Sequence, residues 1–316
     1  MKAVIALLPS AVDARIRAFS IASLVAQILI VGTGGAVRLT GSGLGCPTWP
    51  RCTEDSFVAT PEMGIHGAIE FGNRLLTFVL VIIAIAMFVL VLRIRRERRD
   101  LFLLALLIGL GIPAQAVIGG ISVLTQLNPY VVGLHFVVSI VLVVLATALV
   151  YRSFLGPAGR TAVVPLWYSA LAQATSVLVG LAIAFGILTT GSGPHAGDSG
   201  AARNGLDSEF LQHVHSWPAY ATLAATVLLL LGALRLRGTH PGAPRLLRFV
   251  VILLAVEAVQ VGVGLVQARL GLPEALVVAH MVLACCLTAA MTAVVLSLRA
   301  PAADGRPRPS AARLGR

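Results

Sequence analysis

Hydrophobic residues fall into eight long runs, separated by short stretches that hold most of the charged residues, glycines and prolines. Each run has about 20 residues or more, which is the length that an α-helix needs to cross the hydrocarbon core of a bilayer. The pattern therefore predicts an all-α polytopic membrane protein with eight transmembrane helices. The predicted spans cover residues 17–37, 64–92, 101–121, 131–151, 163–188, 210–234, 246–268 and 275–298.

Lysine and arginine are distributed unevenly between the two sets of loops that alternate along the chain. Of the 24 basic residues, all but five fall in the terminal tails or in the loops after the even-numbered spans. The positive-inside rule places such segments in the cytoplasm. We therefore expect a multi-pass protein of the cell membrane with residues 1–16 as a cytoplasmic tail. Residues 299–316, rich in Pro, Arg and Ala, are expected to form a disordered cytoplasmic tail.

The composition agrees with a membrane protein and excludes other classes. Hydrophobic residues are 58% of the chain and charged residues 12%, about half the share that is usual in soluble domains. The net charge of +11 is spread between apolar runs and does not gather on one folded surface, so we expect no nucleic-acid partner. Membrane lipid is the expected surrounding.

The two halves of the chain resemble each other. Gln115 precedes His135 by 20 residues, Gln260 precedes His280 by the same distance, and a Thr-Gly-Ser-Gly run occurs once in each half. We interpret this as two tandem pseudo-symmetric four-helix bundles that enter the membrane from the same side. The expected division is an N-terminal half at 17–151, a cytoplasmic linker at 152–162 and a C-terminal half at 163–298.

Five of the seven histidines stand near the start of an even-numbered span, close to the expected outer face. Side chains of this type are costly inside a membrane unless they have partners, so a functional role is the default interpretation. Each half offers histidine from its second and its fourth helix, as axial ligation of a heme iron requires. For any single histidine, an interhelical hydrogen bond is the alternative. The candidates are His66 and His135 in the first half, and His213 or His215 with His280 in the second.

Glu70 lies inside the second span, where an unpaired carboxylate costs about 2.5–3.5 kcal/mol on insertion scales. Its spacing from His66 and Asn73 puts all three side chains on one helix face. A candidate acid–base group therefore stands beside a candidate metal ligand. The alternative is a structural pair of Glu70 with Arg74 or with His66.

The first outer loop and its flanking helix ends hold four further candidates. Arg38 and Arg74 stand near the outer face, where they either bind the propionates of a heme or extend to lipid headgroups. Cys46 and Cys52 flank the run Pro-Thr-Trp-Pro-Arg. An oxidising outer compartment favours a disulfide between them, and a metal site is the alternative.

Longer motifs carry a resemblance to a known family. Residues 34–44 read Gly-Gly-Ala-Val-Arg-Leu-Thr-Gly-Ser-Gly-Leu and are followed by Cys-Pro-Thr-Trp-Pro-Arg-Cys at 46–52. Residues 69–74 read Ile-Glu-Phe-Gly-Asn-Arg, and 190–198 read Thr-Gly-Ser-Gly-Pro-His-Ala-Gly-Asp. With the histidine-led fourth and eighth spans, these motifs resemble the signature of the heme A synthase family. The resemblance covers all eight spans, and its first motif is long and specific.

The resemblance implies an oxidoreductase that acts on a methyl group of heme O. Members convert the C8 methyl to a formyl group by successive hydroxylations, which yields heme A for terminal oxidases. It also implies a heme b cofactor in the C-terminal half, held by His215 in preference to His213 and by His280. The substrate heme O is expected in the N-terminal half near His135, and Glu70 matches the acidic residue of the family's catalytic site.

One position departs from the family's pattern. The commoner pattern has a histidine three residues after the acidic residue, but this chain has Asn73 there. Asparagine is a poor iron ligand, so either His66 serves from two turns earlier or the iron is bound from one side only. The cysteine pair that many members carry between 189 and 209 is also absent from the sequence.

Two other functions stay open at this point. A diheme cytochrome b-type electron carrier without heme-modifying activity predicts two histidine ligands in both halves, whereas a transporter predicts a polar path across the membrane. The polar residues of the spans gather near the outer side, which disfavours the transporter. The expected partners of an enzyme are heme O, the enzyme that produces heme O and an unidentified electron donor or acceptor. Whether the chain forms an oligomer stays open.

Overall fold

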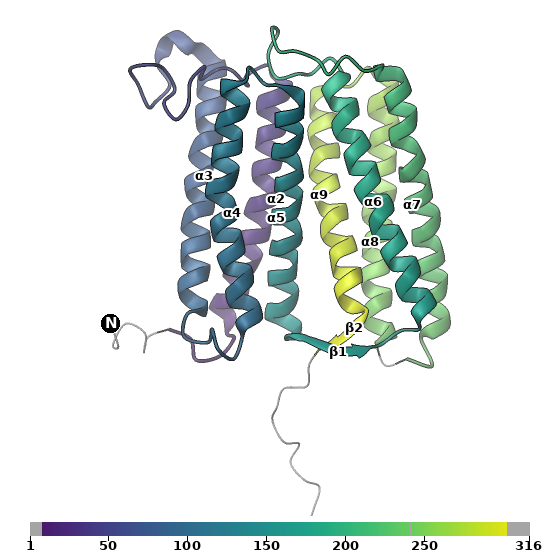
Figure 1. Ribbon diagram of the computed structural model, residues 1–316. Helices are drawn as coiled ribbons and strands as arrows, with labels where there is room; N and C mark the ends of the chain where they lie inside the picture. Colours follow the sequence, from purple (N-terminus) through teal and green to yellow (C-terminus); the bar gives the residue numbers. More distant parts are fainter. Residues whose placement is uncertain (1–7, 241, 302–316) are drawn as a thin grey trace, which may run out of the picture.

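The computed structural model describes residues 8–240 and 242–301 of the chain. Eight long helices dominate this part and stand side by side in Figure 1. They are α2 (Ala14–Leu39), α3 (Gly64–Val91), α4 (Arg99–Leu124), α5 (Pro129–Leu155), α6 (Leu166–Ser192), α7 (Ser208–Leu236), α8 (Ala243–Arg269) and α9 (Glu274–Ser297). The shorter elements are a 3₁₀ turn, η1 (Pro61–Met63), and the strands β1 (Ala158–Ala162) and β2 (Arg299–Pro301).

Every predicted span coincides with one of these helices, and all eight helices are long and apolar enough to cross a membrane. The expectation of an all-α polytopic membrane protein is therefore confirmed. Most helices extend a few residues beyond the predicted limits. The start of the fifth was predicted three residues too early, because Pro165 stands as the cap before Leu166 and the backbone N–H of Val163 donates to Leu298 O at 3.0 Å.

The helices form two rings of four. In the N-terminal half, α2, α3, α4 and α5 pack in chain order and α2 closes the ring against α5. In the C-terminal half, α6 to α9 pack in the same order and α6 contacts α9. The halves meet where α9 packs on α2 and α5, around Val31, Val143 and Cys285. The order of packing is the same in both halves, and their overall pseudo-symmetry stays a prediction.

Local sequence explains where three of the helices begin. Asp13, Asn128 and Asp207 precede α2, α5 and α7, and the side chain of each accepts a hydrogen bond from a backbone N–H of the first turn at 2.7–3.1 Å. These bonds satisfy donors that the start of a helix leaves without an intrahelical partner. At the other end of α5, Gly156 has φ +85°, a left-handed conformation that ends the helix at low cost.

Large apolar side chains fill one end of each half. Met87 and Leu101 in the N-terminal half, and Tyr168 and Leu246 in the C-terminal half, are at most 1% exposed. All four belong to clusters near the end of the molecule at which α2 begins and α9 ends. The candidate histidines of α3, α5, α7 and α9 stand toward the opposite end of the same bundles. The bulky core and the candidate site therefore occupy different depths.

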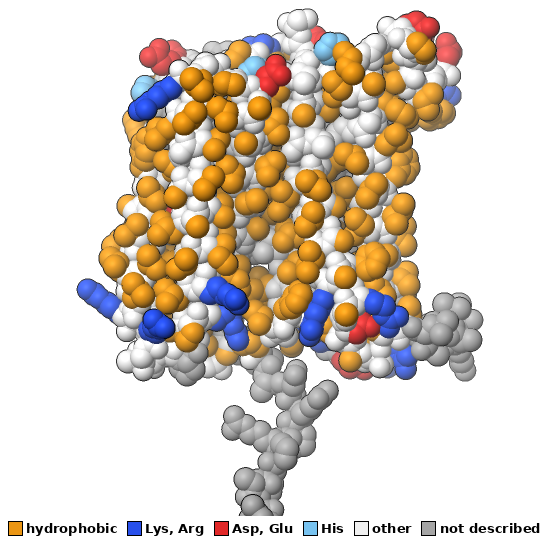
Figure 2. All heavy atoms as spheres, turned by 180° about the vertical axis from the view of Figure 1, so that it is seen from behind, with side chains coloured by type: hydrophobic (Ala, Val, Ile, Leu, Met, Phe, Trp, Pro, Cys, Tyr) orange, Lys and Arg blue, Asp and Glu red, His pale blue; other side chains and the backbone are white. Residues whose placement is uncertain are grey.

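The sides of the molecule are apolar and its two ends are polar. Figure 2 shows hydrophobic side chains over the lateral face, most of the arginine side chains at the lower end, and most of the acidic and histidine side chains at the upper end. Many large apolar side chains are exposed on the flanks of the helices, for example Leu29, Ile82 and Val177. This is the surface that contact with lipid chains favours, and the basic end is the one that the positive-inside rule assigns to the cytoplasm.

A small sheet at the basic end corrects two of the expected boundaries. α5 continues to Leu155, beyond the predicted limit of 151, and the linker after it forms β1. β1 pairs antiparallel with β2 at 299–301, so the first residues of the predicted disordered tail are ordered by backbone hydrogen bonds. The rest of that tail, 302–316, and residues 1–7 of the expected N-terminal tail lie outside the described residues.

Candidate functional site

Two imidazoles face each other inside the C-terminal half. His215 on α7 and His280 on α9 have ring centres 6.1 Å apart, with an angle of 77° between the ring planes. Nδ1 of His215 donates to the carbonyl oxygen of Ala182 at 2.9 Å, which orients the ring and leaves Nε2 for another partner. His213, the other histidine of the same helix, is exposed. Of the two histidines on α7, it is therefore His215 that lies beside His280.

His280 is oriented by a glutamine of the neighbouring helix. The side-chain nitrogen of Gln260 on α8 lies 3.2 Å from Nε2 of His280 and 3.2 Å from its carbonyl oxygen. Nδ1 of His280 is buried and has no hydrogen-bond partner. A buried ring nitrogen without a partner is costly in a low-dielectric interior, and ligation is one way to satisfy it.

Glycines provide the space around both rings. A Cβ atom at Gly186 of α6 would lie 3.1 Å from Cε1 of His215, and one at Gly264 of α8 would lie 3.1 Å from Cε1 of His280. Two imidazoles that ligate one iron have ring centres about 6 Å apart, because two metal–nitrogen bonds of about 2 Å add to about 1 Å within each ring. The observed separation, the free Nε2 of His215 and the close approach of a glycine to each ring fit a heme held by these two histidines.

The N-terminal half presents one imidazole in the same manner. His135 on α5 lies against Gly119 of α4, where a Cβ would stand 3.2 Å from Cε1 of the ring. Its Nδ1 is buried without a hydrogen-bond partner. Gln115 donates to the carbonyl oxygen of His135 at 3.0 Å and also to the hydroxyl of Ser139. The surroundings of His135 therefore resemble those of His280.

The two candidate ligands on α3 lie in different surroundings. Asn73 faces α2, where its Oδ1 accepts a hydrogen bond from Thr33 at 2.8 Å. His66 is exposed in the first turn of α3, and its Nδ1 shares a hydrogen bond of 2.9 Å with Ser42. Seven residues of helix separate the two, about 10 Å along the axis. The structure places His66 at the outer loop and Asn73 inside the bundle.

Glu70 and Arg74 form the structural pair that the sequence offered as an alternative. Arg74 donates to Oε1 of Glu70 through Nε at 3.1 Å and also through Nη2. Oε2 of Glu70 accepts from the backbone N–H of Cys46 at 2.6 Å. Glu70 is only 5% exposed, so its carboxylate is buried with both oxygens in hydrogen bonds.

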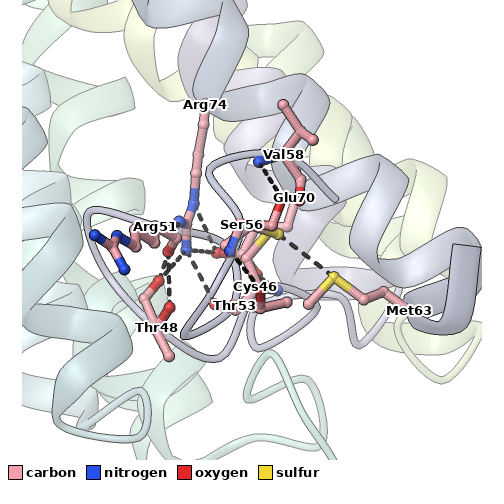
Figure 3. The surroundings of a disulfide bond; sticks show 10 residues. Cys46, Thr48, Arg51, Thr53, Ser56, Val58, Met63, Glu70 and Arg74 are labelled. Atoms are coloured by element: carbon pink, nitrogen blue, oxygen red, sulfur yellow. Dashed lines mark hydrogen bonds and ion pairs between the residues drawn. A yellow bond between two sulfur atoms is a disulfide. The ribbon is translucent and has the colours of Figure 1, made fainter. Parts of the chain in front are cut away.

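The first outer loop is closed by the expected disulfide. Cys46 and Cys52 are bonded to each other, and Figure 3 shows Arg74 reaching from α3 into the loop between them. The guanidinium of Arg74 donates to the carbonyl oxygens of Cys46, Thr48 and Arg51 at 3.0–3.1 Å. Most of its donors are thus used to hold the loop.

The tip of the same loop reaches the helix that supports His135. A Cβ at Gly120 of α4 would collide with the indole ring of Trp49, so the ring lies directly on the helix backbone. Gly120 follows Gly119, the residue that faces His135. The disulfide loop therefore packs across the end of the N-terminal half that is opposite the basic one, beside its imidazole.

Arg38 connects the two halves at the end opposite the basic one. Its Nε donates to His195 O at 2.8 Å and its Nη2 donates to Thr190 O at 3.0 Å, both in the C-terminal half. Nearby, the backbone N–H of Gly43 donates to Gly197 O at 2.8 Å. The outer loop after α6 is thereby fixed to the N-terminal half. The partners of Arg38 in the structure are therefore backbone carbonyl oxygens, one in the last turn of α6 and one in the loop that follows it.

The match to known proteins covers most of the chain. A family model described as cytochrome oxidase assembly protein matches residues 17–292. The chain belongs to this family. The matched range includes six of the helices completely, most of α2 and α9, and every candidate site residue named above.

Three curated relatives are similar over a shorter stretch. Heme A synthase of Lysinibacillus sphaericus is 33% identical over 126 residues, which is 39% of this chain and 40% of the relative. Heme A synthase of Listeria welshimeri is 28% identical over 127 residues, 40% and 41% of the two chains. Heme A synthase of Geobacillus kaustophilus is 30% identical over 110 residues, 34% and 33% of the two chains. The matched stretch spans about two fifths of these relatives or less.

The glycines at 34 and 186, which face Asn73 and His215, were missed by the sequence analysis. A glycine near the outer end of α2 and of α6 was visible in the sequence, but helices rich in glycine offer many such positions. Glu257 on α8 is 2% exposed, and both of its carboxylate oxygens lack a hydrogen-bond partner.

Within the described residues, no three of the His, Cys, Asp and Glu side chains gather as a cage for a metal ion. The candidate ligands instead lie as a pair, His215 with His280, or singly, as His135 does. That arrangement suits an iron whose other ligands belong to a porphyrin.

Proposed function

We propose that this protein is a heme A synthase, which oxidises the C8 methyl group of heme O to a formyl group. The observation that carries the proposal is the pair of imidazoles, His215 and His280, whose ring centres are 6.1 Å apart and each of which packs against a glycine of a neighbouring helix. Membership in the cytochrome oxidase assembly family and the names of the curated relatives support the same activity.

Each half has its own part in this proposal. His215 and His280 would hold a heme b in the C-terminal half. When bound, this heme would transfer electrons one at a time. His135 would bind the iron of the substrate heme O in the N-terminal half. In this proposal the eight helices cross the plasma membrane, both termini lie in the cytoplasm, and the histidines would hold the hemes near the outer face.

The surroundings of Glu70 favour a fixed negative charge over a mobile proton. Its two oxygens accept from Arg74 and from the backbone N–H of Cys46, and only an ionised carboxylate accepts all of these bonds without competition from its own proton. We therefore assign Glu70 the stabilisation of positive charge near the methyl group. Through Cys46 it also positions the disulfide loop over the substrate half.

The proposed reaction is two hydroxylations followed by loss of water. When the balance is written with water as the source of the oxygen atom, the first step turns the methyl into a hydroxymethyl group and releases two electrons and two protons. The second step gives a gem-diol with the same release, and the diol eliminates water to leave the aldehyde. The electrons require an acceptor in the membrane, and the enzyme that produces heme O is the expected source of substrate.

The test is production of heme A by the full chain. A bacterial strain that makes heme O but lacks its own heme A synthase expresses the chain, and the extracted hemes are separated by chromatography. We expect heme A with the wild type, its loss with His135→Ala and with His215→Ala, and its retention with His213→Ala. The last variant is the matched control, since His213 lies on the same helix as His215 but is exposed.

The proposal is overturned if folded, heme-containing wild-type protein leaves heme O unchanged. In that case two tightly bound hemes would identify a cytochrome b-type electron carrier.

A further inference from the structure

The third and fourth helices of the two halves make the same contact at the same depth. Gly119 of α4 faces Cε1 of His135, and Gly264 of α8 faces Cε1 of His280, with nearly equal Cβ distances of 3.2 and 3.1 Å. Each glycine stands five residues before the end of its helix, and each histidine six residues after the start. The two halves present one imidazole each from equivalent positions.

A glutamine repeats with this contact. Gln115 donates to the carbonyl oxygen of His135 at 3.0 Å, and Gln260 donates to the carbonyl oxygen of His280 at 3.2 Å. Each glutamine precedes the glycine of its helix by four residues, which places both on one face. The correspondence therefore extends over a full turn of helix.

The first and second helices repeat the arrangement with a different side chain. In the C-terminal half, Gly186 of α6 faces Cε1 of His215 at a Cβ distance of 3.1 Å. In the N-terminal half, Gly34 of α2 faces Nδ2 of Asn73 at 3.9 Å. Asn73 stands nine residues after the start of α3, and His215 seven residues after the start of α7. Asn73 therefore takes the place that the second imidazole has in the C-terminal half.

The amide of Asn73 does not replace that imidazole. Heme iron takes its protein ligands from histidine, cysteine, methionine or tyrosine, and a neutral amide is not among them. Oδ1 of Asn73 also already accepts a hydrogen bond from Thr33 at 2.8 Å. The side chain thus offers N–H groups as hydrogen-bond donors where the other half offers a ring nitrogen.

His66 is too far along α3 to fill the position. It is seven residues before Asn73, about 10 Å nearer to the outer end of the helix. Its ring is exposed and its Nδ1 shares a hydrogen bond with Ser42. In the C-terminal half the two ligating rings stand only six or seven residues inside their helices, at matching depth.

We propose that the N-terminal half gives heme iron a single protein ligand, His135, and that Asn73 leaves the other axial position open to a small exogenous ligand. This inference rests on the proposed function, because it concerns the heme that the substrate half would bind. It makes the two halves chemically different: the C-terminal half closes both axial positions with imidazole, and the N-terminal half closes one.

Carbon monoxide is the probe for the open position. The full chain carries His215→Ala and His280→Ala, so that the bound heme belongs to the N-terminal half, and is purified with heme and reduced. In this background we expect high-spin heme that binds carbon monoxide. Adding Asn73→His should convert it to low-spin heme and lower the affinity for carbon monoxide at least tenfold. Asn73→Gln, which adds size but no imidazole, should behave as the background does.

Wild-type protein gives an independent measurement that needs no variant to fold. With both halves loaded, about half of its heme should bind carbon monoxide. The inference is overturned if all of the heme in the loaded wild type is low-spin and refuses the gas, which would leave the proposed function intact. Failure of the background protein to hold any heme, with its fold retained, would overturn the proposed function and this inference with it.

Discussion

Replacing Gly264 by alanine places a methyl group against the imidazole of His280. The new Cβ would lie 3.1 Å from Cε1 of the ring. Gly262, two residues earlier on the same helix, has no heavy atom within 4 Å of the corresponding position. The two substitutions are therefore chemically identical and differ only in whether the ring is in the way.

The sign of the effect should differ between the two sites. Carbon atoms attract best at about 3.5–4.0 Å, so the methyl at 264 overlaps the ring by about 0.5 Å and one of them must move. Overpacking of this kind costs about 1–3 kcal/mol. Alanine in a helix interior gains about 0.5–1 kcal/mol over glycine. We expect Gly262→Ala to stabilise by that gain and Gly264→Ala to be less stable than Gly262→Ala by about 1–3 kcal/mol.

Thermal unfolding in detergent and the ratio of heme to protein measure the two consequences. If the ring of His280 moves, its hold on iron weakens, and each 1.4 kcal/mol lost lowers heme affinity about tenfold. Gly264→Ala should then lose heme during washing, whereas Gly262→Ala should keep it. Equal melting temperatures and equal heme retention in both variants would refute the role assigned to the glycine.

Three further expectations concern two buried carboxylates, Arg38 and the disulfide. Glu70→Gln should lower the melting temperature, because the substitution removes the charge of a buried ion pair with Arg74. Glu257→Gln should leave the melting temperature unchanged or raise it, since the carboxylate of Glu257 has no hydrogen-bond partner to lose. An equal loss of stability in both would contradict this contrast. Arg38→Ala should speed backbone hydrogen exchange in the last turn of α6 and the loop after it, and unchanged exchange would show that its bonds to Thr190 O and His195 O do not hold this segment. Changing Cys46 and Cys52 to serine should cost about 2 kcal/mol, the value for a short closed loop, as read from thermal unfolding with a reduced wild-type control.

The number of the helices and their limits to within a few residues were accessible from the sequence because the bilayer imposes both. A span needs about 20 apolar residues, and its backbone must satisfy its own hydrogen bonds, so length and hydropathy are sufficient. The boundary at 163 was missed because Val163 looks like any other apolar residue. Only its backbone bond to Leu298 assigns it to the small sheet region.

The candidate ligands were partly accessible for the same reason. A histidine inside an apolar span is rare enough to stand out, and the shared spacing of Gln115–His135 and Gln260–His280 identified two of the positions. The sequence did not distinguish the surroundings of Asn73 from those of His66, since both lie on one face of α3. Their depth relative to His135 depends on how α3 packs in the ring.

Local sequence was thus sufficient for what each segment does on its own: which residues cross the membrane, where caps begin a helix, and which polar side chains are costly enough to need partners. Contacts between segments required the packed structure. It directed Arg74 to the disulfide loop and Arg38 to the other half. It also placed glycines against imidazoles, because the distance between two helix faces depends on every side chain that separates them.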